Sequence, residues 1–101
     1  MVKHIILWTL KEMPEAEKVA VKKGIKEGLE GLKDKIPGLV DIKVITEVRI
    51  ASSTADLMLD STFESTAALQ DYLKNPVHVE VAQTKVRPFT AARSSFDFEE
   101  V

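Results

Sequence analysis

The sequence contains no cysteine and only two histidines in 101 residues. Without cysteine, the chain can form no disulfide, no thiolate nucleophile and no cysteine-based metal site. The two imidazoles of His4 and His78 are fewer ligands than a structural zinc ion needs, so we expect no metal and no cofactor. The lack of cysteine also fits a reducing compartment, and we expect a cytoplasmic location.

The sequence also lacks a long hydrophobic run and an excess of positive charge. The apolar stretch Ile5–Trp8 is far shorter than the roughly 20 residues of a membrane span, so we expect no membrane association. A formal net charge of -2 argues against nucleic-acid binding, which usually requires a basic surface. Hydrophobic residues make up 45% and charged residues 30%, as in ordinary globular proteins. We interpret residues 1–101 as one complete domain.

Hydrophobic periodicity predicts the elements of secondary structure. Strands, where apolar residues alternate or run together, are expected at 2–10, 39–50, 56–63 and 90–98. Helices are expected from Pro14 to Ile36, ending at Pro37-Gly38, and at 66–74 and 76–84, with loops at 51–55 and 85–88. The order β-α-β-β-α-β predicts an α+β, ferredoxin-like fold with helices on one face of a four-stranded antiparallel sheet.

The first strand has apolar residues on both of its faces. His4, Ile6 and Trp8 alternate with Ile5 and Leu7, and only one set can face the helices. The other set would leave an apolar patch larger than monomers usually expose. We therefore predict a homodimer in which a second copy covers the face carrying Ile5 and Leu7.

A candidate site surrounds the break between the last two predicted helices. Pro76 cannot continue the helix through Tyr72, while Asn75 can cap a new helix that carries His78. The kink would direct Tyr72 and His78 towards one place. His78 could act as a general base on a carbon-bound proton, and Tyr72 could donate a hydrogen bond to the enolate oxygen. The expected ligand is an apolar or aromatic small molecule, and the residues expected to bind it are His4, Trp8, Ile25, Leu29 and Leu73.

Each of these polar residues also has a purely structural interpretation. His78 could hydrogen-bond a backbone carbonyl in its helix, and Tyr72 could satisfy its hydroxyl on His78. His4 lies beside Trp8 on one strand face, where core packing is the simpler explanation. The sequence shows no glycine-rich phosphate loop, nucleophile elbow or zinc-protease motif.

Several segments together resemble the stress-responsive A/B barrel domain family, Dabb. They are the opening Met1–Leu7, the middle Ile36–Leu39, the stretch Thr62–His78 and the closing Phe96–Phe98. The resemblance covers about residues 2–98. It implies a homodimer in which two sheets close an α+β barrel, together with a link to stress responses.

One plant branch of the family, a polyketide cyclase, catalyses an intramolecular aldol condensation with a tyrosine and histidines. The resemblance places its catalytic pair at Tyr72 and His78, and a pocket histidine at His4. A further histidine of that branch is replaced by Leu57 here. The resemblance therefore implies a tyrosine–histidine pocket without the full set of residues of that cyclase.

Three functions remain open from the sequence. The first is a dimeric protein that binds a small molecule or protects against stress without turnover. The second is a cofactor-independent enzyme resembling a cyclase, lyase or monooxygenase. The third is a structural assembly module. A solvent-accessible pocket shared by Tyr72 and His78 would separate the first two from the third.

Overall fold

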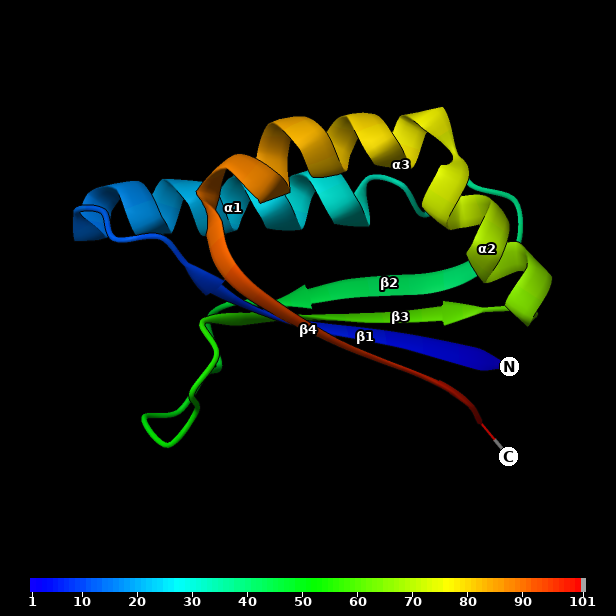
Figure 1. The fold of residues 1–101 in the computed structure, drawn as a ribbon, viewed down its shortest axis with the longest axis horizontal. Coiled ribbons are helices and arrows are strands. Elements are labelled where there is room, and N and C mark those ends of the chain that lie inside the picture. The colour runs from blue at the N-terminus through cyan, green and yellow to red at the C-terminus, as the bar shows by residue number, and fades with distance from the viewer. Residues whose placement is uncertain (101) are drawn as a thin grey trace.

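The computed structural model describes residues 1–100. The elements, in chain order, are β1 (Val2–Leu10), α1 (Glu15–Glu30), β2 (Leu39–Ile45), β3 (Leu57–Phe63), α2 (Thr66–Lys74), α3 (Pro76–Val81), the π-helical turn η1 (Ala82–Val86), the 3-10 turn η2 (Arg87–Phe89) and β4 (Thr90–Glu99). The four strands form one antiparallel sheet in the order β2-β3-β1-β4. All helices lie on one side of this sheet (Figure 1). The predicted ferredoxin-like fold is confirmed.

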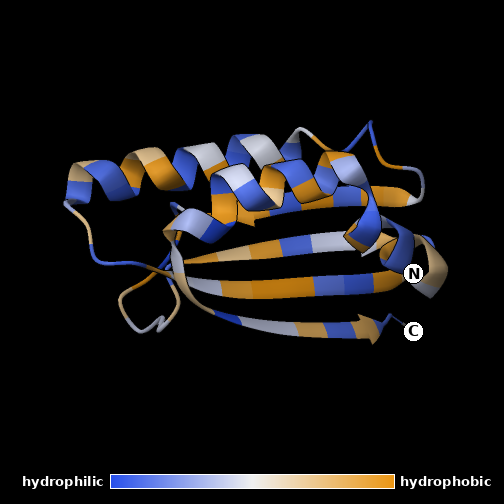
Figure 2. Cartoon of the chain, turned by 45° about the horizontal axis from the view of Figure 1, so that its top comes forward, coloured by the Kyte–Doolittle hydropathy of each residue, from blue (hydrophilic) through white to orange (hydrophobic). Residues whose placement is uncertain are grey.

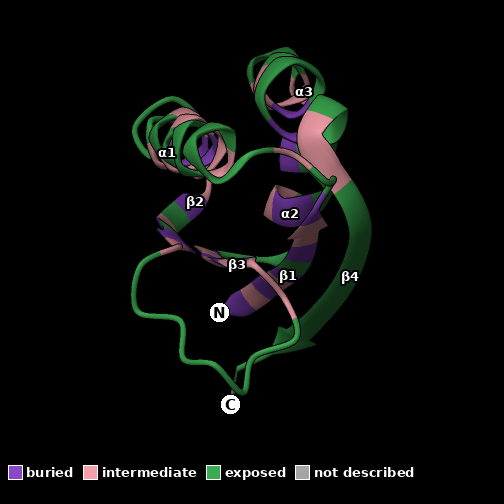
Figure 3. Ribbon diagram, turned by 90° about the vertical axis from the view of Figure 1, so that its left-hand side faces the viewer, coloured by how far each residue is buried: buried purple, intermediate pink, exposed green. Residues whose placement is uncertain are grey.

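The core lies between the helices and the inner face of the sheet. Alternate residues of β1 point inward, so that Ile6 and Trp8 are buried while Leu7 between them is exposed. Phe63 of β3 and Ile25 of α1 have no exposed surface and both belong to this core. Figure 3 shows the buried positions gathered between sheet and helices, with β4 exposed along its length. Packing of one apolar face against the helices is what stabilises this architecture.

The break between α2 and α3 forms as the sequence predicts. The Ser65 hydroxyl accepts a hydrogen bond from the Ala68 amide at 3.1 Å and caps α2. The Asn75 side chain accepts one from the Val77 amide at 2.9 Å and caps α3, where Pro76 takes the first helical position. Asn75 is extended (φ -63°, ψ 126°), so the backbone changes direction there.

The first helix is shorter than predicted, since α1 ends at Glu30 rather than at Ile36. Gly31 is a poor helix former, and the chain continues as turns, with the Lys35 amide bonded to the Leu32 carbonyl at 3.0 Å. Leu32 and Ile36 are nevertheless buried. The apolar spacing therefore identified core residues correctly, although it placed the end of the helix too late.

The second strand also ends early, at Ile45 instead of residue 50, and the loop spans 46–56. Val48 and Ile50 are 78% and 68% exposed, because pairing with β3 stops at Ile45–Met58. An irregular register between Leu39 and Asp41 also leaves Val40 exposed. Alternation is a local signal, whereas a strand persists only where it has a partner to pair with.

The third helix differs from the prediction at its end. The α-helix α3 ends at Val81 and not at residue 84. The chain then continues in helical turns of other types, through η1 and η2, to Phe89. Gly28 allows this segment to pack closely against α1, since a Cβ atom at Gly28 would lie 3.0 Å from the Val81 Cγ1 atom. The wide π-helical turn η1 is followed by the tight 3-10 turn η2, and Arg87 lies at the start of η2, near the end of the helical layer.

The two ends of the described chain lie side by side. β1 and β4 are neighbours, with Val2 paired to Glu99, and the Glu100 amide donates to the Met1 carbonyl at 2.8 Å. Both ends accordingly appear at the same edge of the molecule (Figure 1). Within residues 1–100, no helix combines the length and apolar character needed to cross a membrane.

Candidate functional site

A cavity of about 430 Å³ lies between the inner face of the sheet and the segment from α2 to η2. Its apolar wall comes from both layers and includes Ile6, Trp8, Leu29, Leu59, Leu73 and Val86. Its polar side chains are His4, Tyr72, His78, Thr90, Arg87 and Arg93. The structure thus brings His4, Tyr72 and His78 to one cavity, whose size is within the range of small-molecule sites.

His4 is held by a carboxylate from the neighbouring strand. It is 2% exposed on the inner face of β1, directly opposite Asp97 of β4 in the strand register. Its Nδ1 is hydrogen-bonded to the Asp97 carboxylate Oδ1. Because a carboxylate only accepts, Nδ1 is the donor in this bond. Nε2 is buried and has no hydrogen-bond partner among residues 1–100.

Tyr72 and His78 stack on one another. Their ring centroids are 4.0 Å apart with an interplanar angle of 35°. The hydrogen bond expected between Tyr72 and His78 does not form, and the fully buried Tyr72 hydroxyl has no partner in the described part of the chain. Burial raises the pKa of this phenol, so Tyr72 is a hydrogen-bond donor at neutral pH.

His78 is neutral in this setting. Burial among apolar side chains lowers the pKa of its imidazole to about 4, and the nearby charges of His4, Arg87 and Arg93 act in the same direction. The Leu73 backbone opposes this shift only in part. An imidazole with so low a pKa is a weak base near pH 7, yet it remains a good hydrogen-bonding group.

One residue expected at the site lies elsewhere. Ile25 is fully buried in the core and does not line the cavity, which contradicts its predicted place in the binding site. Leu29, one helical turn later on α1, does line it, as do Trp8 and Leu73. The Ile25 and Leu29 side chains both lie on the buried face of α1, but only Leu29 lines the cavity.

Sequence reasoning missed Arg87 and Arg93 completely. Arg93 lies opposite Trp8 on β4, so the strand register alone could have placed it on the inner face. Strand register could not have placed Arg87, because this residue follows a π-helical turn that no sequence pattern predicts. Neither arginine appeared in any motif, and exposed arginines are usually read as solvated surface.

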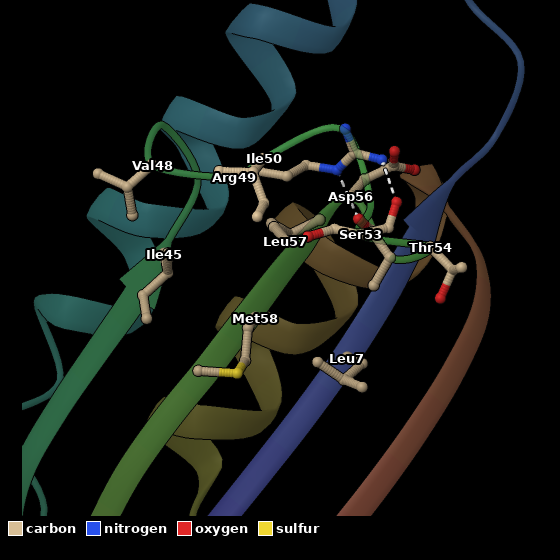
Figure 4. Close-up of a pocket in the computed structure, with 11 residues that line it drawn as sticks. Leu7, Ile45, Val48, Arg49, Ile50, Ser53, Thr54, Asp56, Leu57 and Met58 are labelled. Carbon is tan, nitrogen blue, oxygen red and sulfur yellow. Dashed lines mark hydrogen bonds between the residues drawn. The ribbon is translucent and has the colours of Figure 1, made fainter.

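A second hollow, of about 480 Å³, lies on the outer face of the sheet. Leu7, Ile45 and Met58 project into it from three neighbouring strands (Figure 4). The loop of residues 46–56 forms its rim, where Arg49 donates to the Ser53 and Ala55 carbonyls at 2.8 and 2.7 Å. This hollow contains none of the expected site residues.

Comparison with known proteins shows the family of this chain. The profile of the stress responsive A/B barrel domain, Dabb, matches residues 2–100. The chain belongs to the Dabb family. This agrees with the resemblance in the opening strand and in the segment around Asn75-Pro76. No curated protein sequence matches the chain.

Several solved structures resemble this Dabb domain. A dimeric protein of unknown function with a ferredoxin-like fold from Bacteroides fragilis is 29% identical, with a TM-score of 0.89 over 98% of this chain and 95% of that one. A Dabb family protein from Mesorhizobium loti is 15% identical, with a TM-score of 0.75 over 99% and 96% of the two chains. A hydroxynitrile lyase from Passiflora edulis is 17% identical, with a TM-score of 0.70 over 96% and 90%. The last two likenesses establish the fold alone.

Proposed function

We propose that this Dabb domain is a homodimer that binds an apolar or aromatic small molecule in the cavity between sheet and helices. The observation that carries the proposal is the set of buried polar atoms around this cavity. The Tyr72 hydroxyl, His4 Nε2 and His78 Nδ1 all lack hydrogen-bond partners among the described residues. All three side chains line the same mostly apolar space.

The physical argument rests on the cost of unsatisfied polar groups. A buried polar atom without a partner costs about 1–3 kcal/mol, and native cores rarely retain several in one place. A core built only for stability would use phenylalanine or leucine at these positions. A bound molecule with an apolar body and one or two polar atoms would satisfy the three atoms and fill the space. This favours a binding protein over a purely structural module.

Binding can be tested with the neutral aromatic probe N-phenyl-1-naphthylamine, whose fluorescence increases in apolar sites. We expect saturable binding to the wild-type protein. Ala82 lines the cavity, so Ala82→Phe should occupy it and weaken binding at least about tenfold, equivalent to 1.4 kcal/mol. The matched control is Ala20→Phe on the exposed side of α1, which should bind normally. Equal binding by both variants would contradict the proposed location.

The dimer is proposed from the outer face of the sheet. Leu7, Phe96 and Phe98 are 41%, 68% and 40% exposed on or beside the central strand, an arrangement that monomers seldom tolerate. The similar protein from Bacteroides fragilis is a dimer, as are ferredoxin-like proteins from Thermobifida fusca and Jannaschia. A second copy packed on this face would leave the inner cavity open to ligand, because the two lie on opposite sides of the sheet.

A second candidate function is cofactor-independent proton transfer, and the pairing of His4 with Asp97 favours it. We expected His78 as the base, but its low pKa suits that role poorly, whereas Asp97 would stabilise the imidazolium formed when His4 Nε2 accepts a proton. In such a step, Nε2 takes a carbon-bound proton, the electron pair moves onto an adjacent carbonyl oxygen, and Tyr72 donates a hydrogen bond to that oxygen. The hydroxynitrile lyase of similar fold makes acid–base chemistry a reasonable trial.

Proton transfer can be tested by deuterium exchange at the α-carbon of an aromatic ketone, followed by NMR. Catalysed exchange should be lost in His4→Gln and reduced in Asp97→Asn, while N-phenyl-1-naphthylamine binding is retained. Loss of exchange in His78→Gln alone would restore His78 as the base. A lack of exchange with every trial ketone would contradict proton transfer. It would not affect the proposed binding function, which the fluorescence titration tests separately. A stress-related role rests on the family name and would require expression measurements.

A further inference from the structure

Two arginines that have no side-chain partner among residues 1–100 line the cavity. Arg87 of η2 and Arg93 of β4 both line it, although they are separated by the start of the last strand. Neither takes part in an ion pair or side-chain hydrogen bond with any of residues 1–100. Within the described part of the chain, no aspartate or glutamate lines the cavity, and Asp97 is already bonded to His4.

The chain as a whole carries no excess of positive charge. The sequence has 16 acidic and 14 basic residues, so an unpaired cationic pair is not a consequence of a basic surface. The charges of Arg87 and Arg93 are close enough to lower the pKa of His78, which places their influence inside the cavity. Positive charges at the wall of an apolar cavity concentrate anions there.

Resting on the proposed binding function, we propose that the natural ligand is an amphipathic carboxylate whose anionic group binds Arg87 and Arg93. Its hydrocarbon or aromatic body would lie against Ile6, Leu29 and Leu59, which form the apolar wall. A guanidinium presents a planar fork that matches the two oxygens of a carboxylate, and such charge-assisted pairs are among the stronger hydrogen bonds.

The inner polar atoms complement this orientation. His4 Nε2 and the Tyr72 hydroxyl have no hydrogen-bond partner among residues 1–100 and are buried away from solvent, whereas both arginines are exposed. A carboxylate held at the exposed arginines would therefore leave the opposite end of the ligand beside these two atoms. A hydroxyl or carbonyl on that end would satisfy them. Guanidinium groups bind carboxylates and phosphates alike, so our choice of a carboxylate rests on the lack of a glycine-rich phosphate loop in the sequence.

The inference can be tested with octanoate and its uncharged counterpart octanamide, which have the same chain length. Trp8 is the only tryptophan, is 4% exposed and lines the cavity, so its emission reports binding at this place. We expect octanoate to bind about tenfold more tightly than octanamide at low salt, with the difference decreasing at high salt. In Arg87→Gln/Arg93→Gln the two ligands should bind within about twofold of each other, mainly because octanoate is weakened.

A charge-matched control separates a local effect from net charge. Lys23→Gln/Lys35→Gln removes two positive charges from exposed positions outside the cavity and should retain the preference for octanoate. Equal loss in both double variants, or an unchanged preference in the arginine variant, would overturn the inference. Tighter binding of octyl phosphate than of octanoate would overturn the choice of carboxylate. Equal binding of octanoate and octanamide to the wild-type protein would refute an anionic ligand but agree with the proposed binding function. If neither compound bound, the result would count against the anionic ligand and against the binding function.

Discussion

The two faces of the sheet are built from the same strands and have opposite environments. On the inner face, Ile6, Val44 and Leu59 are 6%, 1% and 1% exposed. On the outer face, Leu7 and Phe96 are apolar too, but are 41% and 68% exposed. Figure 2 shows apolar residues along the strands, although helices cover only one side. Apolar content alone therefore does not define the core; the inner face stabilises the fold, and the outer face is free for association.

The largest effect should come from truncating the inner face. Phe63 has no exposed surface, so Phe63→Ala should lower the free energy of unfolding by about 3–5 kcal/mol. The matched change on the outer face, Phe96→Ala, removes the same atoms from an exposed side chain. At a protein concentration that keeps both variants monomeric, it should cost less than about 1 kcal/mol. Urea denaturation of both variants gives the comparison, and equal losses would show that the faces are not energetically distinct.

The outer face should respond to charge through association instead. Ile5→Asp places a carboxylate among Phe96 and its neighbours on the proposed interface. We expect the dimer dissociation constant to rise at least about 100-fold, since burying an unpaired charge at an interface costs several kcal/mol. Sedimentation velocity measures this change, with Lys23→Asp on exposed α1 as the control. A wild-type monomer at micromolar concentration, or a dimeric Ile5→Asp protein, would contradict this interface.

In the cavity that covers the inner face, His78 of α3 should make stability depend on pH. Its pKa falls from 6.5 to about 4 on folding, so the unfolded chain binds the extra proton between these values. The free energy of unfolding should therefore decrease as the pH is lowered from about 6.5 to 4, and His78→Gln should remove about 1–2 kcal/mol of that decrease, allowing for solvent screening of a half-buried group. Thermal melts across this range test it. Identical pH profiles for wild type and His78→Gln would show that His78 is solvated.

The smallest effect should come from Tyr72→Phe. The hydroxyl has no partner in the described chain, so its loss should raise the free energy of unfolding of the unliganded protein by about 1 kcal/mol, the lower end of the cost of a buried unpartnered polar atom. Affinity for a ligand bearing a carbonyl should nevertheless fall. Denaturation and calorimetric titration of the same variant separate the two effects. A large loss of stability would indicate that the hydroxyl has a structural role.

Most of the fold could be predicted because its signals are local. Ser65 and Asn75 cap helices through their own side chains, and the alternation in β1 follows directly from the pleat of a strand. The error in β2 occurred because a strand depends on a distant partner. Val48 and Ile50 alternate correctly, yet no residue of β3 remains to pair with them.

The site was predictable only in part, for the same reason. Tyr72 and His78 flank a visible helix break, and His4 shares a strand face with Trp8. The partnership of His4 with Asp97, however, joins positions 93 residues apart through the register of β1 and β4. Arg87 reaches the cavity through a π-helical turn, whose extra residue cannot be read from periodicity.

The adjacency of the first and last strands gives the fold a nearly closed chain. Since the Glu100 amide already meets the Met1 carbonyl, a few glycines could join the ends without disturbing β1 or β4. New termini could be introduced in the exposed loop of residues 46–56, which does not line the cavity that contains Tyr72 and His78. A circular permutant that begins in this loop would join β4 to β1 as a continuous hairpin and would keep the contacts of the inner face. Its new termini would lie beside the outer hollow, where further segments could be attached.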